Sequence, residues 1–194
     1  MTQRHKLSAV ALLTALAAGA SGCSGTNEPA NSDARPATAS ATAPRSPRAQ
    51  SSALSPEERA GKEASTAYRA YWQVVMDYYA SETPDPKVLQ KHATSVALRQ
   101  VEEDARAMHK EGQIATGTVA LDTPTVTKTD LGRKVPSVSL STCIDVSKWK
   151  FQDARTGKPA DLDRGLDRYV IKASLEKWPQ GWTVLRDEPQ GTKC

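Results

Sequence analysis

The ionisable side chains that could serve as a general acid or base stand in weak positions for that chemistry. Such catalysis needs a carboxylate or a histidine held in a pocket, often beside a tyrosine hydroxyl. His109 flanks the apolar face of an expected helix, and Asp145 lies on the polar face of an expected strand. Asp77 falls on the polar side of a helix and His92 lies near a turn, so both are predicted at the surface. We therefore expect no catalysis, with an enzyme that uses His109 or Asp145 beside a tyrosine as the alternative.

Five large aromatic side chains follow one another closely in the first expected helix. Their spacing places them on a single stripe at about 100° per residue. A stripe of this kind usually forms hydrophobic core, but five rings could also line a ligand cavity, where a buried tyrosine hydroxyl needs a partner. The candidate pocket residues are Tyr68, Tyr71, Trp72, Tyr78 and Tyr79.

Motifs that bind metals or cofactors are missing from the sequence. The acidic run at residues 161–167 is similar to a calcium loop, but Gly165 stands one place early and Lys172 replaces the bidentate glutamate. There is no glycine-rich phosphate loop, nucleophile elbow or pair of metal-ligand histidines. We expect neither a metal nor a cofactor.

The first 22 residues have the order of a secretory signal peptide, namely charged, then apolar, then small residues. Arg4 and Lys6 precede an uncharged and mostly apolar segment at residues 8–20. As a helix this segment reaches about 20 Å, against a hydrocarbon core of about 30 Å, so it is too short to span a membrane. Export is the better interpretation.

The signal peptide ends in Ala20-Ser21-Gly22-Cys23, which resembles the lipobox of bacterial lipoproteins. The resemblance implies cleavage before Cys23 and lipidation of its thiol with fatty acyl chains such as palmitate. It also implies anchoring to the outer face of the cytoplasmic membrane, which requires more than one acyl chain. Ala20 departs from the pattern, where Leu, Val or Ile is more usual. An ordinary secreted protein, cut at residues 18–21, is the alternative.

Composition separates a linker from a folded domain. Of the 31 residues at positions 24–54, 22 are Ala, Ser, Pro, Thr or Gly, and Leu54 is the only large apolar side chain. Such a segment cannot build a core. The expected organisation is a signal peptide at residues 1–22, a lipidated cysteine and linker at 23–54, and one domain at 55–194.

The basic net charge of +4 does not indicate a nucleic-acid partner. The expected domain holds 21 Lys and Arg against 20 Asp and Glu, and no basic run stands out. A nucleic-acid module concentrates basic residues on one face or along one helix. We expect a membrane contact through the lipid on Cys23 and an unknown cell-surface protein or small ligand as partner.

The cysteines support export. If Cys23 carries a lipid, Cys143 and Cys194 remain as an even pair in an oxidising compartment and are expected to form a disulfide. Two free thiols are the alternative. The bond would join the C-terminal tail to the strand that carries Cys143.

Helices are expected first along the domain. Ser55, Pro56 and Glu58 form a capping-box sequence, which starts a helix that runs up to the breakers around Pro84. A short helix is expected at residues 86–92. A longer one is expected at 95–111, with Gly112 as its stop and an apolar face of Leu98, Val101, Ala105 and Met108.

Four strands are expected after Gly112, where the apolar period changes from 3.6 to 2. The first covers residues 113–121 and runs on toward 128 through a kink at Pro124. The second carries Cys143 on its polar face, and a long loop follows at 149–165. The last two form a hairpin whose turn is Trp178 to Gly181. This order predicts an α+β domain with three helices packed on a curved four-stranded antiparallel meander.

The pattern is similar to that of the nuclear transport factor 2-like superfamily. The resemblance rests on the aromatic-rich first helix, Cys143-Ile144-Asp145 in mid-sheet and the closing hairpin around Trp178 and Trp182. It is closer to the uncharacterised actinobacterial lipoproteins of that superfamily. The resemblance implies a cone-shaped, cystatin-like fold with a pocket at its wide end. The superfamily includes isomerases, cyclases and many binding modules, so the fold says little about function.

These expectations combine into one hypothesis about function. We expect a lipid-anchored, non-catalytic extracytoplasmic domain that binds a protein partner or a small apolar ligand at the cell surface. A small isomerase or cyclase-type enzyme and a purely structural spacer are the alternatives.

Overall fold

The computed structural model describes residues 53–160 and 165–194. The predicted signal peptide, the lipobox with Cys23 and nearly all of the predicted linker lie outside the described residues. Within the described residues, no helix is both long enough and apolar enough to cross a membrane.

Helix α1 (Pro56–Ala80) begins at the predicted capping box. The backbone amide of Glu58 donates to Ser55 Oγ at 3.1 Å, and the amide of Ser55 donates to Glu58 Oε2 at 2.8 Å. These bonds satisfy amides that have no partner inside the helix. The predicted stripe faces the core, where Tyr68, Tyr71 and Trp72 are buried.

Helices α2 (Pro86–Leu89) and α3 (Ser95–Lys110) follow where they are predicted, although α2 is shorter than expected. Gly112 ends α3 with a φ of 69°, a left-handed conformation that favours glycine. The face of α3 that meets the core is displaced slightly from the predicted one, because Ala97 is buried while Leu98 is only partly buried.

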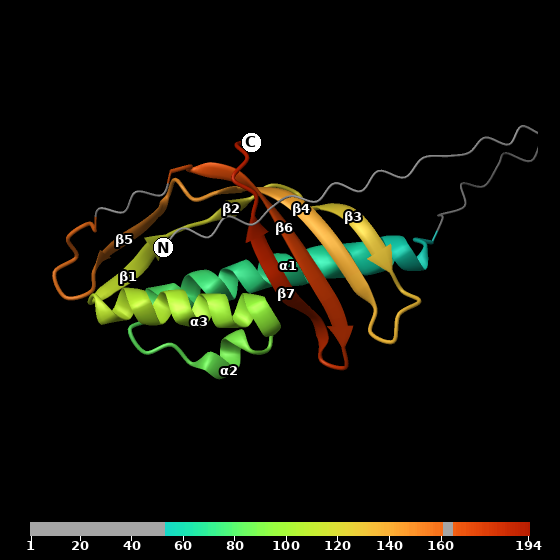
Figure 1. Ribbon diagram of the computed structural model, residues 1–194, viewed down its shortest axis with the longest axis horizontal. Coiled ribbons are helices and arrows are strands. Elements are labelled where there is room, and N and C mark those ends of the chain that lie inside the picture. The colour runs from blue at the N-terminus through green and yellow to red at the C-terminus, as the bar shows by residue number, and fades with distance from the viewer. Residues whose placement is uncertain (1–52, 161–164) are drawn as a thin grey trace, which may run out of the picture. The chain divides into compact units, whose positions relative to one another are not determined.

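The larger sheet keeps the predicted antiparallel meander order, but it contains five strands instead of four, because two pieces of the predicted first strand pair with β4. Its order is β2-β4-β6-β7, and β3 pairs with β4 beyond the end of β2. The strands are β2 (Ala120–Leu121), β3 (Thr125–Asp130), β4 (Ser137–Asp145), β6 (Arg168–Trp178) and β7 (Gly181–Pro189). All pairings in it are antiparallel. The α+β class is confirmed, and Figure 1 shows the sheet curling over α1 with α3 beside that helix.

The predicted first strand is divided into three pieces. β1 (Gln113–Gly117) leaves the larger sheet at Gly117, which has a φ of 86°. A Cβ atom at this glycine would collide with the carbonyl oxygen of Lys148, so the two backbones approach closely only because the residue is glycine. Pro124 then separates β2 from β3, since proline cannot donate to a ladder.

The loop predicted at 149–165 is wrong in its first part. Residues Trp149–Asp153 form β5, which pairs antiparallel with β1 in a separate two-stranded sheet. Trp149 and Phe151 are partly buried and pack against the core. This strand is short, and its partner is more than thirty residues away in sequence, so a local pattern alone did not identify it.

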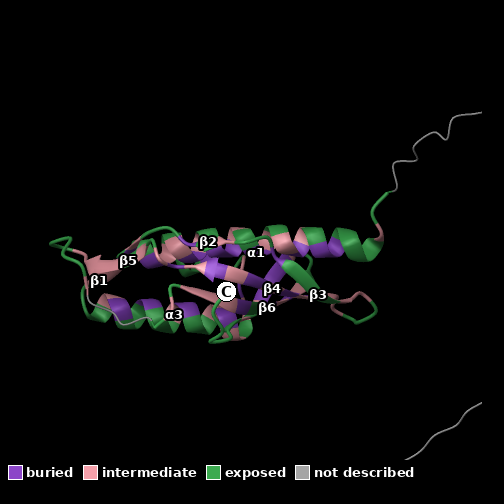
Figure 2. Cartoon of the chain, turned by 90° about the horizontal axis from the view of Figure 1, so that it is seen from above, coloured by how far each residue is buried: buried purple, intermediate pink, exposed green. Residues whose placement is uncertain are grey.

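The central strands confirm the predicted alternation. Val138, Leu140 and Ile144 of β4 are buried, whereas Cys143 between them lies on the other face. β6 and β7 form the predicted hairpin around Pro179 and Gln180. In Figure 2 the buried residues of α1 and α3 lie on the sides of these helices that face the strands, which places the core between helices and sheet.

Candidate functional site

A cavity of about 150 Å³ lies between α1, α3 and the inner face of the larger sheet. α1 contributes Tyr71, Trp72, Val75 and Tyr79, and α3 contributes Ala97, Gln100, Val101 and Asp104. The strands contribute Trp149, Tyr169, Ile171, Asp187 and Pro189. Most of these side chains are apolar or aromatic and a few are polar, as in small-molecule sites.

Aromatic rings form several walls of this cavity. Trp149 stands nearly perpendicular to Trp72 and to Tyr79, at 81° in both pairs, with ring centroids 6.4 and 5.3 Å apart. Tyr71 and Trp72 meet at 74°. The rings are therefore differently oriented walls instead of a single stack, and their edge-to-face contacts stabilise that arrangement.

A chain of hydrogen bonds runs from α1 to the carboxyl group of Asp187. The indole Nε1 of Trp72 donates to the Tyr68 hydroxyl at 2.9 Å, and this hydroxyl donates to Asp187 Oδ1 at 2.7 Å. Tyr68 is fully buried. Each polar atom in the chain is thus satisfied, and the chain fixes the position of Asp187 relative to the rings.

Burial raises the pKa of Asp187 to about 7, although hydrogen bonds from Tyr68 and Tyr71 oppose the shift. The same burial, together with the nearby Asp187 charge, raises the pKa of both tyrosines well above the usual value. Near neutral pH the carboxyl group therefore exists in both protonation states while the phenols stay protonated and can donate.

A β-bulge turns Asp187 toward the cavity. Leu175 pairs with Val184, but Ser174 pairs with Arg186, so Leu185 is an extra residue in β7. Strict alternation from Val184 would point Asp187 outward. The bulge reverses the alternation, and Asp187 pairs with Ala173 on the inner face.

The cavity opens beside Gln100 and Asp104, both of which are exposed residues of α3. The Tyr79 hydroxyl donates to Asp104 Oδ2 across a long 3.5 Å contact. Partial burial raises the pKa of Asp104, a shift that the Tyr79 contact opposes. A second carboxyl group thus lies at the mouth, and Asp187 lies further inside.

The structure brings together three of the five predicted pocket residues. Tyr71, Trp72 and Tyr79 line the cavity. Tyr68 does not line it but holds Asp187 through its hydroxyl. Tyr78 is partly buried at the edge of the stripe and lines different hollows.

Neither weak catalytic candidate lies in this cavity. Asp145 is on the outer face of the sheet, where Arg168 lies 3.6 Å away and the Ser147 amide donates to it at 2.9 Å. These contacts hold the pKa of Asp145 below its usual value, with the Ser147 hydrogen bonds as the largest cause. His109 lines a separate hollow with Tyr78 and Glu102.

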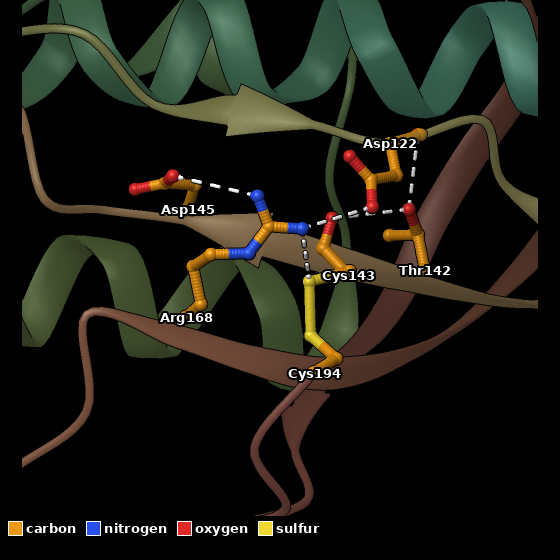
Figure 3. The surroundings of a disulfide bond; sticks show 6 residues. All are labelled: Asp122, Thr142, Cys143, Asp145, Arg168 and Cys194. Carbon is orange, nitrogen blue, oxygen red and sulfur yellow. Dashed lines mark hydrogen bonds and ion pairs between the residues drawn. A yellow bond between two sulfur atoms is a disulfide. The ribbon is translucent and has the colours of Figure 1, made fainter.

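The predicted disulfide between Cys143 and Cys194 is present, with Cα atoms 6.0 Å apart. Figure 3 shows Arg168 beside it, donating from Nη2 to Cys143 Sγ at 3.2 Å and to Asp122 Oδ2 at 3.1 Å. The tail before Cys194 continues along β6, since the Val170 amide donates to the carbonyl of Thr192. The bond therefore holds the end of the chain that follows the Asp187 strand.

Sequence reasoning missed four of the lining residues that matter most. Trp149 falls in the predicted loop, and Tyr169 was not among the candidate pocket residues. Asp187 and Asp104 carried no signal that distinguished them from surface acids. Among the described residues, no group of three or more His, Cys, Asp or Glu could hold a metal ion.

Comparisons with known proteins add a distant structural likeness. No family model matches the chain, and no curated protein matches its sequence. Among solved structures, the chain is similar to the crystal structure of the intermembrane space region of the chloroplast protein ARC6. That likeness has a TM-score of 0.45 and 10% sequence identity, and covers 66% of this chain and 94% of the other. The site is therefore interpreted from its own geometry.

Proposed function

We propose that this chain is a lipid-anchored extracytoplasmic domain that binds a small ligand in the cavity between α1, α3 and the sheet. The observation that supports it best is the combination of aromatic walls with one oriented carboxyl group, Asp187. Ligand sites typically join mostly apolar walls to a few well-placed polar groups. A cavity of about 150 Å³ suits a ligand about the size of benzene.

The cavity favours binding over a spacer role. A spacer needs only a filled core, and burying an acid such as Asp187 without a cationic partner costs stability. Here the acid is held by Tyr68 beside unfilled space. A stability cost placed next to a cavity is typical of a functional site.

Indole signals provide a direct test of ligand binding. Trp72 and Trp149 line the cavity, whereas Trp178 and Trp182 do not, so the chain contains its own controls. We expect titration with benzyl alcohol to shift the indole N–H resonances of Trp72 and Trp149 in an NMR spectrum of the ¹⁵N-labelled protein. Absent shifts, or equal shifts at all four tryptophans, would contradict the proposal.

A cavity-filling variant makes this test sharper. Ala97 is buried and lines the cavity, while Ala107 is exposed on the same helix. Ala97→Leu is expected to abolish the shifts at Trp72 and Trp149, and Ala107→Leu to leave them unchanged. Shifts that survive in Ala97→Leu would place the ligand elsewhere.

The lipid anchor on Cys23 is a separate part of the proposal. It is supported by the lipobox resemblance and by the linker composition at residues 24–54. Changing Cys23 to Ser is expected to release the protein from the membrane fraction of an expressing bacterium. If the variant remains in the membrane fraction to the same extent, lipidation at Cys23 is wrong.

The resemblance to nuclear transport factor 2-like lipoproteins of actinobacteria stays part of the proposal. In support, three helices lie against a curled antiparallel sheet, and the cavity lies between the two. A cone with a pocket at its wide end is what that superfamily would lead one to expect.

Acid–base catalysis in the same cavity is a second candidate, favoured by the pKa of about 7 at Asp187. A base of this pKa beside tyrosine donors suits proton abstraction next to a carbonyl group. The test is hydrogen–deuterium exchange in D₂O at the two carbons next to the carbonyl group of cyclohexanone. Exchange that is faster with the protein than with Asp187→Asn would support catalysis, and equal exchange would contradict it.

A further inference from the structure

The charge of the cavity lining is entirely negative in the part of the chain that the structure describes. Asp104 and Asp187 line the cavity, and no lysine, arginine or histidine does. Nor is either carboxylate paired with a basic side chain among the described residues. The protein thus leaves two acids facing the cavity without a cation of its own.

We propose that the cavity binds a small organic cation, an ammonium group on a body about the size of a benzene ring, with its charge between Asp104 and Asp187 and against the aromatic walls. The inference rests on the proposed binding function and names the chemical class of its ligand. It deepens that proposal because it predicts which charge the ligand carries.

Aromatic walls support a cation more specifically than they support a neutral ligand. The face of an aromatic ring attracts an ammonium group, and the attraction grows when water is excluded. Tyr71, Trp72, Tyr79, Trp149 and Tyr169 all line the cavity. Because neighbouring rings are inclined at 74° and 81° to one another, the cavity is lined by rings in different orientations.

The buried carboxyl group supplies the second half of the argument. Hydrogen bonds from Tyr68 and Tyr71 orient the acid but bring no positive charge to it. A buried carboxylate is costly unless a cation or several hydrogen bonds compensate it. A bound ammonium group would provide the missing charge. An anionic ligand would instead meet two like charges in a medium of low dielectric constant.

Cation binding should be coupled to the ionisation of Asp187. The titratable groups that act on this carboxyl are Tyr68 and Tyr71 from α1 and its neighbour Glu188, and Asp104 from α3 and Tyr169 from β6 line the same cavity. Since the pKa of Asp187 is about 7 in the free protein, a bound cation would favour the ionised form and lower that pKa. The affinity for a cation should therefore rise with pH and level off above about pH 8.

Three probes of one shape and different charge test the proposal: benzylammonium, benzyl alcohol and benzoate. Their dissociation constants are measured at pH 8 by isothermal titration calorimetry on the chain with its disulfide formed. We expect benzylammonium to bind at least about ten-fold more tightly than benzyl alcohol, and benzoate not to bind. The preference should shrink at pH 5, where benzylammonium is still charged and Asp187 is protonated.

Variants assign the preference to the two carboxyl groups. Asp187→Asn and Asp104→Asn are each expected to reduce the ratio of the benzylammonium affinity to the benzyl alcohol affinity, while benzyl alcohol still binds. The matched control is Asp145→Asn, the same change on the outer face of the sheet, which should leave the ratio unchanged.

Each alternative outcome has a distinct meaning. If benzyl alcohol binds as tightly as benzylammonium, the cation proposal fails while the binding function stands. If none of the probes binds, both fail. If the cation preference persists in both Asp187→Asn and Asp104→Asn, the preference arises outside this cavity and the assignment is overturned.

Discussion

Asp145 and Asp187 belong to the same antiparallel sheet, and they lie on its opposite faces. Asp145 ends β4 on the outer face, beside Arg168 and the Ser147 amide. Asp187 lies on the inner face of β7, where its Oδ1 accepts from the fully buried Tyr68. The pKa of the first lies below its usual value, and the pKa of the second rises to about 7.

The difference shows how little residue type says about chemistry. Hydrogen bonds from Ser147, and to a smaller extent the Arg168 guanidinium, favour the charged form of Asp145, whereas loss of water disfavours the charged form of Asp187. Which of the two environments an aspartate occupies depends on the face of the strand. In β7 that face was set by one extra residue, Leu185.

The largest expected effect on stability concerns the outer face of the sheet, where the disulfide holds the C-terminal tail. Replacing both Cys143 and Cys194 with Ser should lower the free energy of unfolding by about 2–4 kcal/mol, because a long loop in the unfolded chain is no longer closed. Urea unfolding followed by tryptophan fluorescence measures the loss. The wild-type protein in excess reductant is the control and should match the double variant. Equal stability of all three samples would show that the bond contributes nothing.

The next effect concerns the inner face and depends on pH. Asp187 has a folded pKa of about 7 against an ordinary value of 3.8, so its protonation stabilises the fold at low pH. That contribution is complete below the unfolded pKa and is lost as the pH rises toward 7. Asparagine does not titrate. The stability of Asp187→Asn relative to wild type should therefore rise by about 2 kcal/mol between pH 5 and pH 8.

Chemical unfolding of both proteins at the two pH values measures this difference. Asp145→Asn is the matched control, since Asp145 is ionised throughout that range. If Asp187→Asn shows the same difference from wild type at pH 5 and at pH 8, the raised pKa of Asp187 is wrong.

A smaller effect should follow from breaking the hydrogen-bond chain. Tyr68→Phe removes the donor to Asp187 and the acceptor of Trp72 Nε1. We expect a loss of about 1–3 kcal/mol, because buried polar atoms are left unsatisfied. The pKa of Asp187 should rise further, as seen by ¹³C NMR of its carboxyl group. Tyr78→Phe, on the same helix but outside this chain of bonds, is the control. Identical effects of the two variants would refute the role of Tyr68.

The smallest effect is expected for Asp145→Asn. Its ion pair with Arg168 is partly exposed, and such pairs contribute little to stability. The melting temperature at neutral pH should change by no more than about 2 °C. In the wild type the Asp145 carboxyl should titrate below its usual pKa, so any stabilising effect is lost only as the pH falls through that range. A large drop in the melting temperature of Asp145→Asn would mean that the aspartate on the outer face contributes more to stability than proposed.

Much of the fold was predictable because its signals are local. The capping box at Ser55, the stop at Gly112 and the turn around Pro179 depend on a few neighbouring residues. The faces of β4 followed from alternation alone, and so did the outward position of Cys143. The division of the first strand and the pairing of β5 with β1 were not predictable, because they depend on contacts between distant segments.

The candidate site was predictable only in part. The stripe of aromatic residues on α1 correctly indicated Tyr71, Trp72 and Tyr79, because helical periodicity places them on one face. Asp104 and Asp187 resembled many other acids in the sequence. Their importance arises from α3 and β7, which bring them to the same cavity as the rings.

The sequence by itself determined the order of the elements, the buried stripe of α1, the α+β class and the pair of cysteines available for a disulfide. These depend on the covalent geometry of helix and strand, which repeats with a fixed period. Only the tertiary structure decided that Leu185 is a bulge, that Asp187 faces inward and that Trp149 is a wall of the cavity. Trp149 reaches the cavity because β5 pairs with the distant β1. The bulge at Leu185 is a change of register inside the β6–β7 hairpin, which the alternation of residue types does not contain.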